Sequence, residues 1–555
     1  MRGCVIPLVI AAALPAWTAE PVRARRAMVV TREQHATRAG LDVLAAGGNA
    51  VDAAVAVGFV LAVTHPSAGN LGGGGFMLIR FADGRATFLD FRERAPGLAS
   101  HDMYRHSAGK PDGESLIGYR AAGVPGTVRG LEHASRKYGR RSWAELVQPA
   151  VDLASKGFPV SWGLSQSLQK AARMLDRFPE SKRVFLRDGR YYEPGETLVQ
   201  PDLAGVLARI RKQGAQDFYE GETARQLAAD MRAHGGLITL EDLKAYGVTE
   251  RRPLTGAYRG YDILSAPPPS SGGVGILQML GVLDGSGYEK GGQGSASSIH
   301  YMVEAMRRFF ADRAQYLADP DFVKVPVSSL LAPSYVAGLR RSILPDRATP
   351  SGQIHAGVFA ASESTETTHY TIADAEGNVV AVTYTLNESY GCKVTATGLG
   401  FLLNNEMDDF AARPGVPNAN GLVLGEANAV QPRKRPLSSM SPTIILRGGK
   451  PYLALGSPGG PTIINTVLEV IVNVLDFGLN VQDAVNRPRF HHQWMPDSIA
   501  MEPGFSPDTV ALLESRGHKI KPVTMQGEVS AIRFDGGWLE GAPDPRVEAT
   551  AEGLN

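Results

Sequence analysis

The sequence predicts an α+β protein in which helices pack on sheets of short strands. Three observations predict this class. Helical patterns occupy residues 129–158, 201–235 and 299–317. After residue 367, short runs alternate between polar and apolar side chains, which is typical of strands. Turn-forming residues lie between these runs, so consecutive strands can pair as hairpins.

The N-terminal part begins with two Ala-rich helices within residues 34–61, which Gly47-Gly48-Asn49 separates. A loop over residues 64–75 follows and ends in four consecutive glycines. Two strands are predicted at 76–79 and 87–91, with a turn between them. This region therefore combines helices with the first hairpin of a sheet.

The C-terminal part is predicted as a sheet with helices packed on it. Four strands and then one helix are expected at residues 368–373, 378–386, 443–446, 452–455 and 462–474. Two segments have the composition of loops: 266–275 is rich in Pro, Ser and Gly, and 348–366 is polar. We expect the second of these to be poorly ordered.

The composition limits the classes of function. A chain of 555 residues can bury a large core as one to three domains. A net charge of +1 argues against nucleic acid as a partner, because phosphate binding needs a basic surplus. The only cysteines, Cys4 and Cys392, cannot form a multi-cysteine zinc site.

The first residues have the pattern of an export signal. Arg2 precedes an apolar run over residues 5–14, and small residues follow up to Ala19. The run is too short for a membrane anchor, and no later segment has about 18 unbroken apolar residues. We therefore predict a signal peptide at 1–19, a mature protein without a membrane segment, and a periplasmic or secreted location.

The first C-terminal hairpin has a register that can be read from the sequence. If its turn centres on Glu376, Thr367 lies opposite Thr385 and His369 lies opposite Thr383. Residues two apart share a face, so Thr383, Thr385 and Asn387 point the same way. Such a polar face is either exposed to solvent or part of a site.

A threonine at position 367 becomes a competent nucleophile only in one setting. Its hydroxyl is weak at neutral pH, but the amine of an N-terminal threonine can take the hydroxyl proton. Cleavage after Glu366, at the end of the polar segment, would create that amine.

Several longer motifs extend along the chain. They are Thr367-Thr368-His369-Tyr370, Leu402-Leu403-Asn404-Asn405-Glu406-Met407-Asp408-Asp409-Phe410, Pro436-Leu437-Ser438-Ser439-Met440-Ser441-Pro442, Gly456-Ser457-Pro458-Gly459-Gly460 and the segments 47–57, 70–76, 90–96, 267–273 and 378–387. Together they resemble the gamma-glutamyltranspeptidase family of N-terminal nucleophile hydrolases. The resemblance implies a four-layer αββα sandwich built from two subunits of one precursor, here a large subunit 20–366 and a small catalytic subunit 367–555.

The resemblance also implies the roles of individual residues. Thr367 matches the nucleophile and Thr385 the threonine that hydrogen-bonds to it, while the backbone amides of Gly459 and Gly460 match the oxyanion hole. The residues that match the binding site of the glutamyl α-carboxylate are Arg92, Ser438 and Ser439. Those that match the binding site of the α-ammonium group are Asn387, Glu406 and Asp409.

The implied reaction is ping-pong transfer of a γ-glutamyl group from glutathione or a relative to water, an amino acid or a dipeptide, after autocatalytic cleavage between Glu366 and Thr367. It needs no cofactor or metal. Two alternatives remain open. A related glutaryl or cephalosporin acylase would not need the ammonium-binding residues, and a non-catalytic exported binding protein would not need Thr367.

Other patterns favour structural roles. No Gly-Lys-Ser/Thr follows Gly72–Gly75, so a nucleotide loop is not expected. Ser457 does not stand in a Gly-x-Ser-x-Gly elbow. His491 and His492 are adjacent and would point to opposite faces of a strand, which disfavours a shared metal ion. One departure concerns Asn420, which stands where better-known bacterial members have a lid tyrosine, so the balance of hydrolysis and transfer is open.

Overall fold

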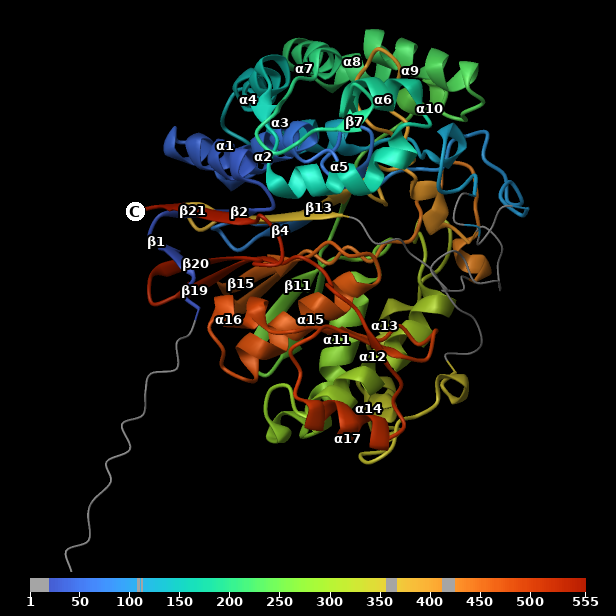
Figure 1. Ribbon diagram of the computed structural model, residues 1–555. Helices are drawn as coiled ribbons and strands as arrows, with labels where there is room; N and C mark the ends of the chain where they lie inside the picture. Colours follow the sequence, from blue (N-terminus) through green and yellow to red (C-terminus); the bar gives the residue numbers. More distant parts are fainter. Residues whose placement is uncertain (1–18, 107–109, 111–112, 356–366, 412–424) are drawn as a thin grey trace, which may run out of the picture.

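Two seven-stranded antiparallel sheets form the centre of the computed structural model, which describes residues 19–106, 110, 113–355, 367–411 and 425–555 (Figure 1). The first sheet has the order β1 (Val22–Ala24), β20 (Trp538–Pro543), β19 (Ser530–Asp535), β15 (Lys450–Gly456), β14 (Thr443–Arg447), β11 (Tyr261–Ser265) and β10 (Leu254–Tyr258). The second has the order β21 (Thr550–Leu554), β2 (Ala27–Thr31), β12 (Thr368–Ala373), β13 (Val379–Thr385), β3 (Gly74–Arg80), β4 (Ala86–Phe91) and β9 (Thr249–Arg251).

Helices cover the outer face of each sheet, and the two sheets face each other (Figure 1). Above the second sheet lie α1 (Gln34–Ala45), α2 (Ala50–Thr64), α3 (Thr127–Tyr138), α4 (Trp143–Lys156), α5 (Trp162–Leu175), α6 (Pro179–Phe185), α7 (Pro201–Gln213), α8 (Ala215–Glu220), α9 (Glu222–Ala233) and α10 (Leu240–Lys244). Below the first sheet lie α11 (Gly272–Leu283), α12 (Ala296–Tyr316), α13 (Val327–Leu330), α14 (Pro333–Arg341), α15 (Thr462–Leu475), α16 (Val481–Asn486) and α17 (Pro507–Ser515).

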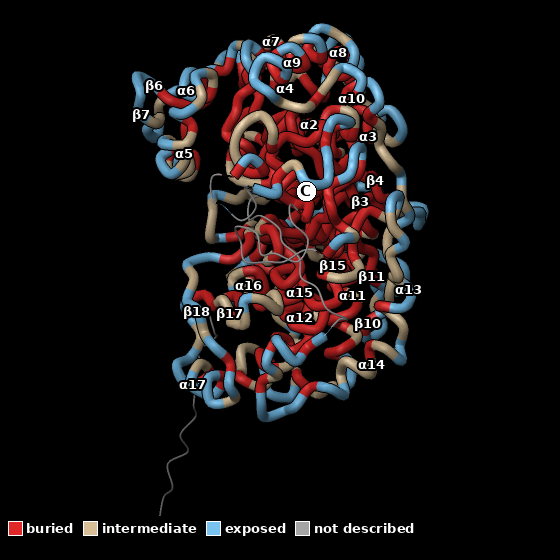
Figure 2. The backbone as a smooth tube through the Cα atoms, turned by 90° about the vertical axis from the view of Figure 1, so that its right-hand side faces the viewer, coloured by how far each residue is buried: buried red, intermediate tan, exposed pale blue. Residues whose placement is uncertain are grey.

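The alternation of side chains along β3 explains why its residues 76–79 are all apolar. Met77 and Ile79 point into the core under the upper helices, whereas Phe76 and Leu78 point into the core between the sheets. Both faces of the strand are therefore buried. Figure 2 shows this buried centre between outer surfaces that are partly exposed.

Most predicted elements are confirmed. Helices α1 and α2 separate at Gly47–Asn49, and Asn49 caps α2 in a capping box with Asp52. The predicted helical stretch 129–158 covers most of α3 and all of α4, 201–235 covers α7 to α9, and 299–317 covers most of α12. The strands and helix predicted downstream of residue 440 are β14, β15 and α15.

The prediction of a loop over 266–275 is wrong at its end, because α11 begins at Gly272. The glycines there serve close packing rather than a turn. A Cβ atom on Gly273 would lie 2.3 Å from the carbonyl oxygen of Ala266, and one on Gly275 would lie 2.5 Å from the ring of Phe309. Helix α5 lies in a stretch for which the sequence predicted no element.

The hairpin of β12 and β13 has the predicted register. Thr368 pairs with Tyr384 and His369 pairs with Thr383, which places Thr367 opposite Thr385. Of the two alternatives for this polar face, exposure to solvent is excluded, since the side chains of Thr383 and Thr385 are buried between the sheets.

Parts of the remaining predictions fall outside the described residues. These parts are residues 1–18 of the signal peptide and residues 356–366 of the polar segment, while residues 351–353 form one helical turn. Within the described part of the chain, no helix is long and apolar enough to cross a bilayer.

Candidate active site

Thr367 lies directly before β12 and is almost completely buried, with 7% of its surface exposed. Its hydroxyl donates a hydrogen bond of 3.3 Å to the hydroxyl of Thr385, at the end of β13. The hydroxyl of Thr385 also accepts a bond of 2.8 Å from the backbone amide of Asn387. The hairpin register thus brings the predicted nucleophile and its predicted partner together.

The glycine-rich loop before β3 holds the end of β13 in place. The amide of Asn70 donates to the carbonyl oxygen of Thr385 at 2.9 Å, and its oxygen accepts from the backbone of Gly73 at 2.9 Å. A Cβ atom on Gly73 would lie 2.0 Å from that same carbonyl oxygen, and one on Gly72 would lie 2.2 Å from the carbonyl of Leu402. The glycines are therefore needed for close backbone packing, as the absence of a phosphate-loop motif suggested.

Asn387 connects the hairpin of the predicted nucleophile to the acidic segment that follows residue 403. It has a left-handed backbone with φ of 78°, which turns the chain away from β13. Its amide donates to the carbonyl oxygen of Asn405 at 2.9 Å, and Asn405 in turn accepts from the backbone of Glu388. Asn404 accepts from the backbone of Glu406 at 3.0 Å. No sequence pattern indicated these roles for Asn404 and Asn405.

Arg92, Glu406 and Asp409 form one buried ionic cluster. The guanidinium of Arg92 pairs with Glu406 at 2.6 Å and also with Asp409, and it donates to the carbonyl oxygen of Leu437 at 3.0 Å. Each of the three charged side chains is less than 5% exposed. The structure thus brings together the residues predicted for the two charges of a glutamyl group, and it pairs them with one another.

Glu93 also lies in this cluster and was missed by the sequence analysis. Its carboxyl group is fully buried and lies 3.7 Å from the guanidinium of Arg92. Burial raises the pKa of Glu93 to about 8, so this group is largely protonated at neutral pH. The positive charge of Arg92 is therefore balanced mainly by Glu406 and Asp409.

Ser438 and Ser439 follow directly after Leu437 and are both buried. The carbonyl oxygen of Ser438 accepts from the backbone and the hydroxyl of Ser271, both at 2.7 Å. The hydroxyl of Ser439 accepts from Arg313 on α12 at 3.2 Å. Ser271 in the Pro/Ser/Gly-rich loop and Arg313 on the long helix α12 therefore hold the serine pair in place. The sequence indicated the loop by its composition but gave no sign of either contact.

Gly459 and Gly460 lie in the turn between β15 and α15, and both have positive φ, 130° and 56°. A Cβ atom on Gly459 would lie 2.4 Å from the hydroxyl of Thr462, so a larger residue would not fit. The preceding strand reaches the hairpin at Gly456, where a Cβ atom would lie 2.3 Å from the ring of His369. The glycine turn therefore follows a strand that packs on the hairpin of Thr367.

His491 and His492 each have protein partners. His491 bonds to the amides of Asn465 at 2.7 Å and Gln493 at 2.8 Å. His492 accepts from Arg307 at 3.1 Å. These contacts agree with structural roles for both residues.

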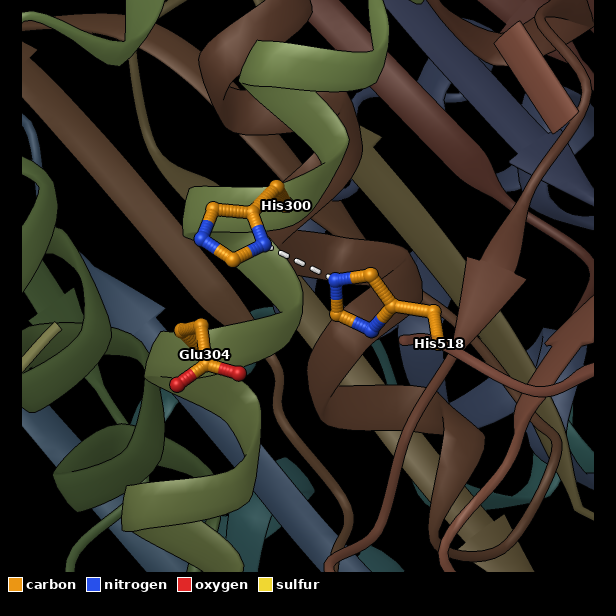
Figure 3. Close-up of side chains that lie close together, drawn as sticks. All are labelled: His300, Glu304 and His518. Atoms are coloured by element: carbon orange, nitrogen blue, oxygen red, sulfur yellow. Dashed lines mark hydrogen bonds between the residues drawn. The ribbon is translucent and has the colours of Figure 1, made fainter. Parts of the chain in front are cut away.

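A different group has the composition of a metal site, but its contacts argue against one. Atoms of His300, Glu304 and His518 lie within 4.8 Å of one another (Figure 3). His300 is bonded to His518 at 2.8 Å, and the carboxylate of Glu304 is paired with Arg307 at 2.6 Å and with Arg308 at 2.7 Å. A cation would lie beside two guanidinium groups, so the cluster is better explained as a polar contact between α12 and the C-terminal part.

This cluster predicts acid sensitivity. Burial lowers the pKa of His518 to about 3 and that of His492, which accepts from Arg307 beside the cluster, to about 4. In the unfolded chain, histidine pKa values lie near 6.5. The contribution of these two histidines to the free energy of unfolding is therefore fully present above pH 6.5. It falls as the pH drops toward 4, by about 2 kcal/mol per histidine at pH 5. We expect His518→Asn to reduce the difference between unfolding free energies at pH 7.5 and pH 5 by about that amount. An unchanged difference, measured by urea unfolding, would contradict this.

Asn420, at the position of the lid tyrosine, lies outside the described residues. The adjacent acidic pair is described, and its two members differ. Asp408 accepts a hydrogen bond of 2.7 Å from Ser115, whereas Asp409 pairs with Arg92. Burial raises the pKa of Asp408 to about 6.

Comparison with known proteins agrees with this arrangement. The family model described as gamma-glutamyltranspeptidase matches residues 36–554. A glutathione hydrolase proenzyme from Escherichia coli (strain K12) is 51% identical over 529 residues, which cover 95% of this chain and 91% of that protein.

Two solved structures are similar as well. A cephalosporin acylase from Bacillus halodurans matches with a TM-score of 0.86 at 27% identity, over 99% of this chain and 100% of that chain. A gamma-glutamyltranspeptidase from Helicobacter pylori matches with a TM-score of 0.57 at 44% identity, over 59% of this chain and 94% of that chain. From the near-complete family match and the high identity, the chain belongs to the gamma-glutamyltranspeptidase family and is an enzyme of the N-terminal nucleophile hydrolase type.

Proposed function

We propose that the protein cleaves itself between Glu366 and Thr367, and that Thr367 then carries the γ-glutamyl group during hydrolysis and transfer. Gamma-glutamyl transfer and hydrolysis is the reaction of the family to which the chain belongs. Glutathione, which the name of the E. coli relative specifies, is the proposed donor. The main support for Thr367 as the nucleophile is the hydrogen bond of 3.3 Å between the hydroxyls of Thr367 and Thr385 in the buried hairpin.

The same hydroxyl performs two reactions in this proposal. In the precursor, it attacks the carbonyl carbon of Glu366, the amide becomes an ester through an N→O shift, and water hydrolyses the ester. The new amine of Thr367 then accepts the proton of its own hydroxyl as that oxygen attacks the γ-glutamyl carbonyl. The leaving amine departs with a proton, and water or an amino acid or dipeptide acceptor attacks the ester carbonyl to complete the cycle.

The buried ionic cluster suits a glutamyl group, which carries one carboxylate and one ammonium. Its carboxylate would pair with Arg92 and accept from the hydroxyls of Ser438 and Ser439, since a guanidinium binds carboxylates in two-point fashion. Its ammonium would pair with the carboxylates of Asp409 and Glu406 and donate to the side-chain oxygen of Asn387. The net charge of the cluster does not change on binding, because the ligand brings one charge of each sign.

The turn at Gly459 and Gly460 would supply the oxyanion hole. Backbone amides that are fixed in advance stabilise the negative oxygen of a tetrahedral intermediate without reorganisation. The hydroxyl of Thr462 donates to the carbonyl oxygen of Gly459 at 2.7 Å and so ties this turn to the start of α15. These groups and the threonine amine supply the chemistry, so the proposed reaction uses no metal or cofactor.

We further propose that the fold is the four-layer αββα sandwich, divided into a large subunit 20–366 and a small subunit 367–555 after removal of residues 1–19 during export to the periplasm or the medium. Strand order supports stable association after cleavage. The small-subunit hairpin β12–β13 lies between β2 and β3 of the large subunit. Backbone hydrogen bonds on both sides would hold the pair together as a heterodimer.

An acylase is the second candidate, because the cephalosporin acylase of B. halodurans matches along the full chain. A glutaryl side chain lacks the α-ammonium group, so it would leave the buried carboxylates of Glu406 and Asp409 without a new cationic partner. The residues of the ionic cluster therefore favour a γ-glutamyl donor. The same residues and the intact threonine pair also disfavour a non-catalytic binding protein.

The proposal is tested with purified protein, glutathione and the acceptor glycylglycine. We expect two bands on a denaturing gel, release of glutamate from glutathione, and γ-glutamyl-glycylglycine when the dipeptide is present. Release from glutaryl-7-aminocephalosporanic acid but not from glutathione would favour the acylase. An uncut chain with full activity would contradict the mechanism.

A further inference from the structure

A cavity of about 770 Å³ opens beside Thr367. Among the predicted site residues, all of which the structure describes, Thr367 alone lines this cavity. Arg92 and Asp409, which suit the glutamyl group, belong to the buried cluster outside it. The cavity therefore lies where the amine half of a γ-glutamyl compound extends from the scissile bond.

Trp162 is the first residue of α5 and lines the cavity. It is 66% exposed, an unusual environment for the largest aromatic side chain. Met525 lines the cavity as well and is 43% exposed. Helix α5 lies beside α6 and the short strands β6 (Leu186–Arg187) and β7 (Arg190–Tyr191), at the edge on the left of Figure 2. Exposed apolar groups at the wall of a cavity indicate a surface that a ligand covers.

The position of Trp162 is fixed from a distant part of the chain. The carboxylate of Glu548 accepts from the hydroxyl of Ser161 at 2.5 Å and from the backbone of Gly163 at 2.8 Å, on either side of the tryptophan. A Cβ atom on Gly163 would lie 2.6 Å from that carboxylate. The backbone that carries the exposed indole is thus held before any ligand arrives, which reduces the entropy lost on binding.

Lys170 lies two helical turns after Trp162, with Gln166 between them, and all three line the cavity. The other lysine and arginine side chains of the lining have partners. Arg32 pairs with Glu528 at 2.8 Å and Arg546 pairs with Glu502 at 2.7 Å. The ammonium of Lys393 donates to two backbone carbonyl oxygens at 2.7 Å. Lys170 forms no salt bridge with a carboxylate among the residues that the structure describes. Its ammonium can therefore bind an anionic group of a ligand.

We infer that Trp162 and Lys170 bind the amine half of the substrate, the indole covering a bulky or aromatic side chain and the ammonium pairing with the free carboxylate. The preferred donors and acceptors are then γ-glutamyl derivatives of aromatic or large apolar amino acids, and those amino acids themselves. This inference rests on the proposed function, because it needs Thr367 to be the acylated residue.

The test compares γ-glutamylphenylalanine with γ-glutamylglycine as donors. Trp162→Ala should lower kcat/KM for the phenylalanine donor about tenfold, the size expected for a lost aromatic contact, and leave the glycine donor within about twofold. Trp162→Phe should retain most of the preference. Leu512→Ala removes another exposed apolar side chain, 54% exposed on α17 and outside the cavity, and should change neither donor.

Lys170→Gln tests whether the Lys170 ammonium pairs with the carboxylate on the amine half of the substrate. The variant should lower kcat/KM for γ-glutamylphenylalanine about threefold, as expected for an exposed ion pair. The γ-glutamyl amide of phenethylamine has no carboxylate on its amine half, so its kcat/KM should not change.

Equal losses on both donors in Trp162→Ala, or no loss on either, would overturn the inference while the wild-type activity still supports the proposed function. A wild-type protein that is inactive on both donors would overturn the proposed function and this inference with it.

Discussion

Thr367→Ala is expected to give a single uncut chain without γ-glutamyl activity, because in the proposed mechanism the same hydroxyl serves cleavage and catalysis. Loss of a nucleophile that acts together with its base lowers activity by a thousandfold or more, on the order of what other hydrolases show. A denaturing gel and a glutathione assay measure the two effects. In the wild type, N-terminal sequencing of the small fragment should begin at Thr367 with Thr-Thr-His-Tyr.

Thr367→Ser is the matched control, since it keeps the hydroxyl and removes only a methyl group. This variant should still cleave and retain activity, although more slowly. The structure supports an intact fold in both variants, because the neighbouring strand β12 is held by β2 and β13 on its two sides. An alanine variant that is cut at the same place would show that another group performs the cleavage.

Asp409→Ala is expected to raise KM for glutathione steeply while leaving cleavage of the precursor intact. Removing one partner of a buried charge pair costs about 2–5 kcal/mol, which corresponds to a loss of roughly 30-fold to several thousandfold. Arg92 keeps Glu406 at 2.6 Å and the carbonyl of Leu437 at 3.0 Å, so the cluster should not collapse. Steady-state kinetics with glutathione measure the effect.

Asp408→Asn provides the control for this prediction. Asp408 is the adjacent carboxyl group and is equally buried, but it accepts from Ser115 instead of pairing with Arg92. Its pKa of about 6 means that the neutral form is already accessible near neutral pH. We expect little change in KM. Equal increases in both variants would indicate a general disturbance of the segment, and unchanged kinetics in Asp409→Ala would remove this residue from the site.

The hairpin shows what local rules can determine. Alternation of side chains and the position of the turn at Glu376 suffice to place Thr367 opposite Thr385, since strand pairing advances one residue at a time. The same rules located most helices and strands near the site. They failed at the start of α11, because a run of glycines has the composition of a loop whether or not close packing requires it.

The family motifs supplied the remaining site residues, and the structure brings several of them into contact. Sequence spacing could not reveal that Arg92 pairs with Asp409, which lies 317 positions away. Nor could it reveal Glu93, whose raised pKa results from burial that many segments create together.

The sequence by itself thus determined the class of fold, the hairpin register and, through long specific motifs, the family. Only the tertiary structure decided that the polar face of the hairpin is buried, that Arg92 pairs with Asp409, and that Trp162 lines the cavity beside Thr367. The physical reason is that secondary structure depends on neighbours along the chain, whereas burial and charge pairing depend on segments that meet only when the two sheets and their helices pack together.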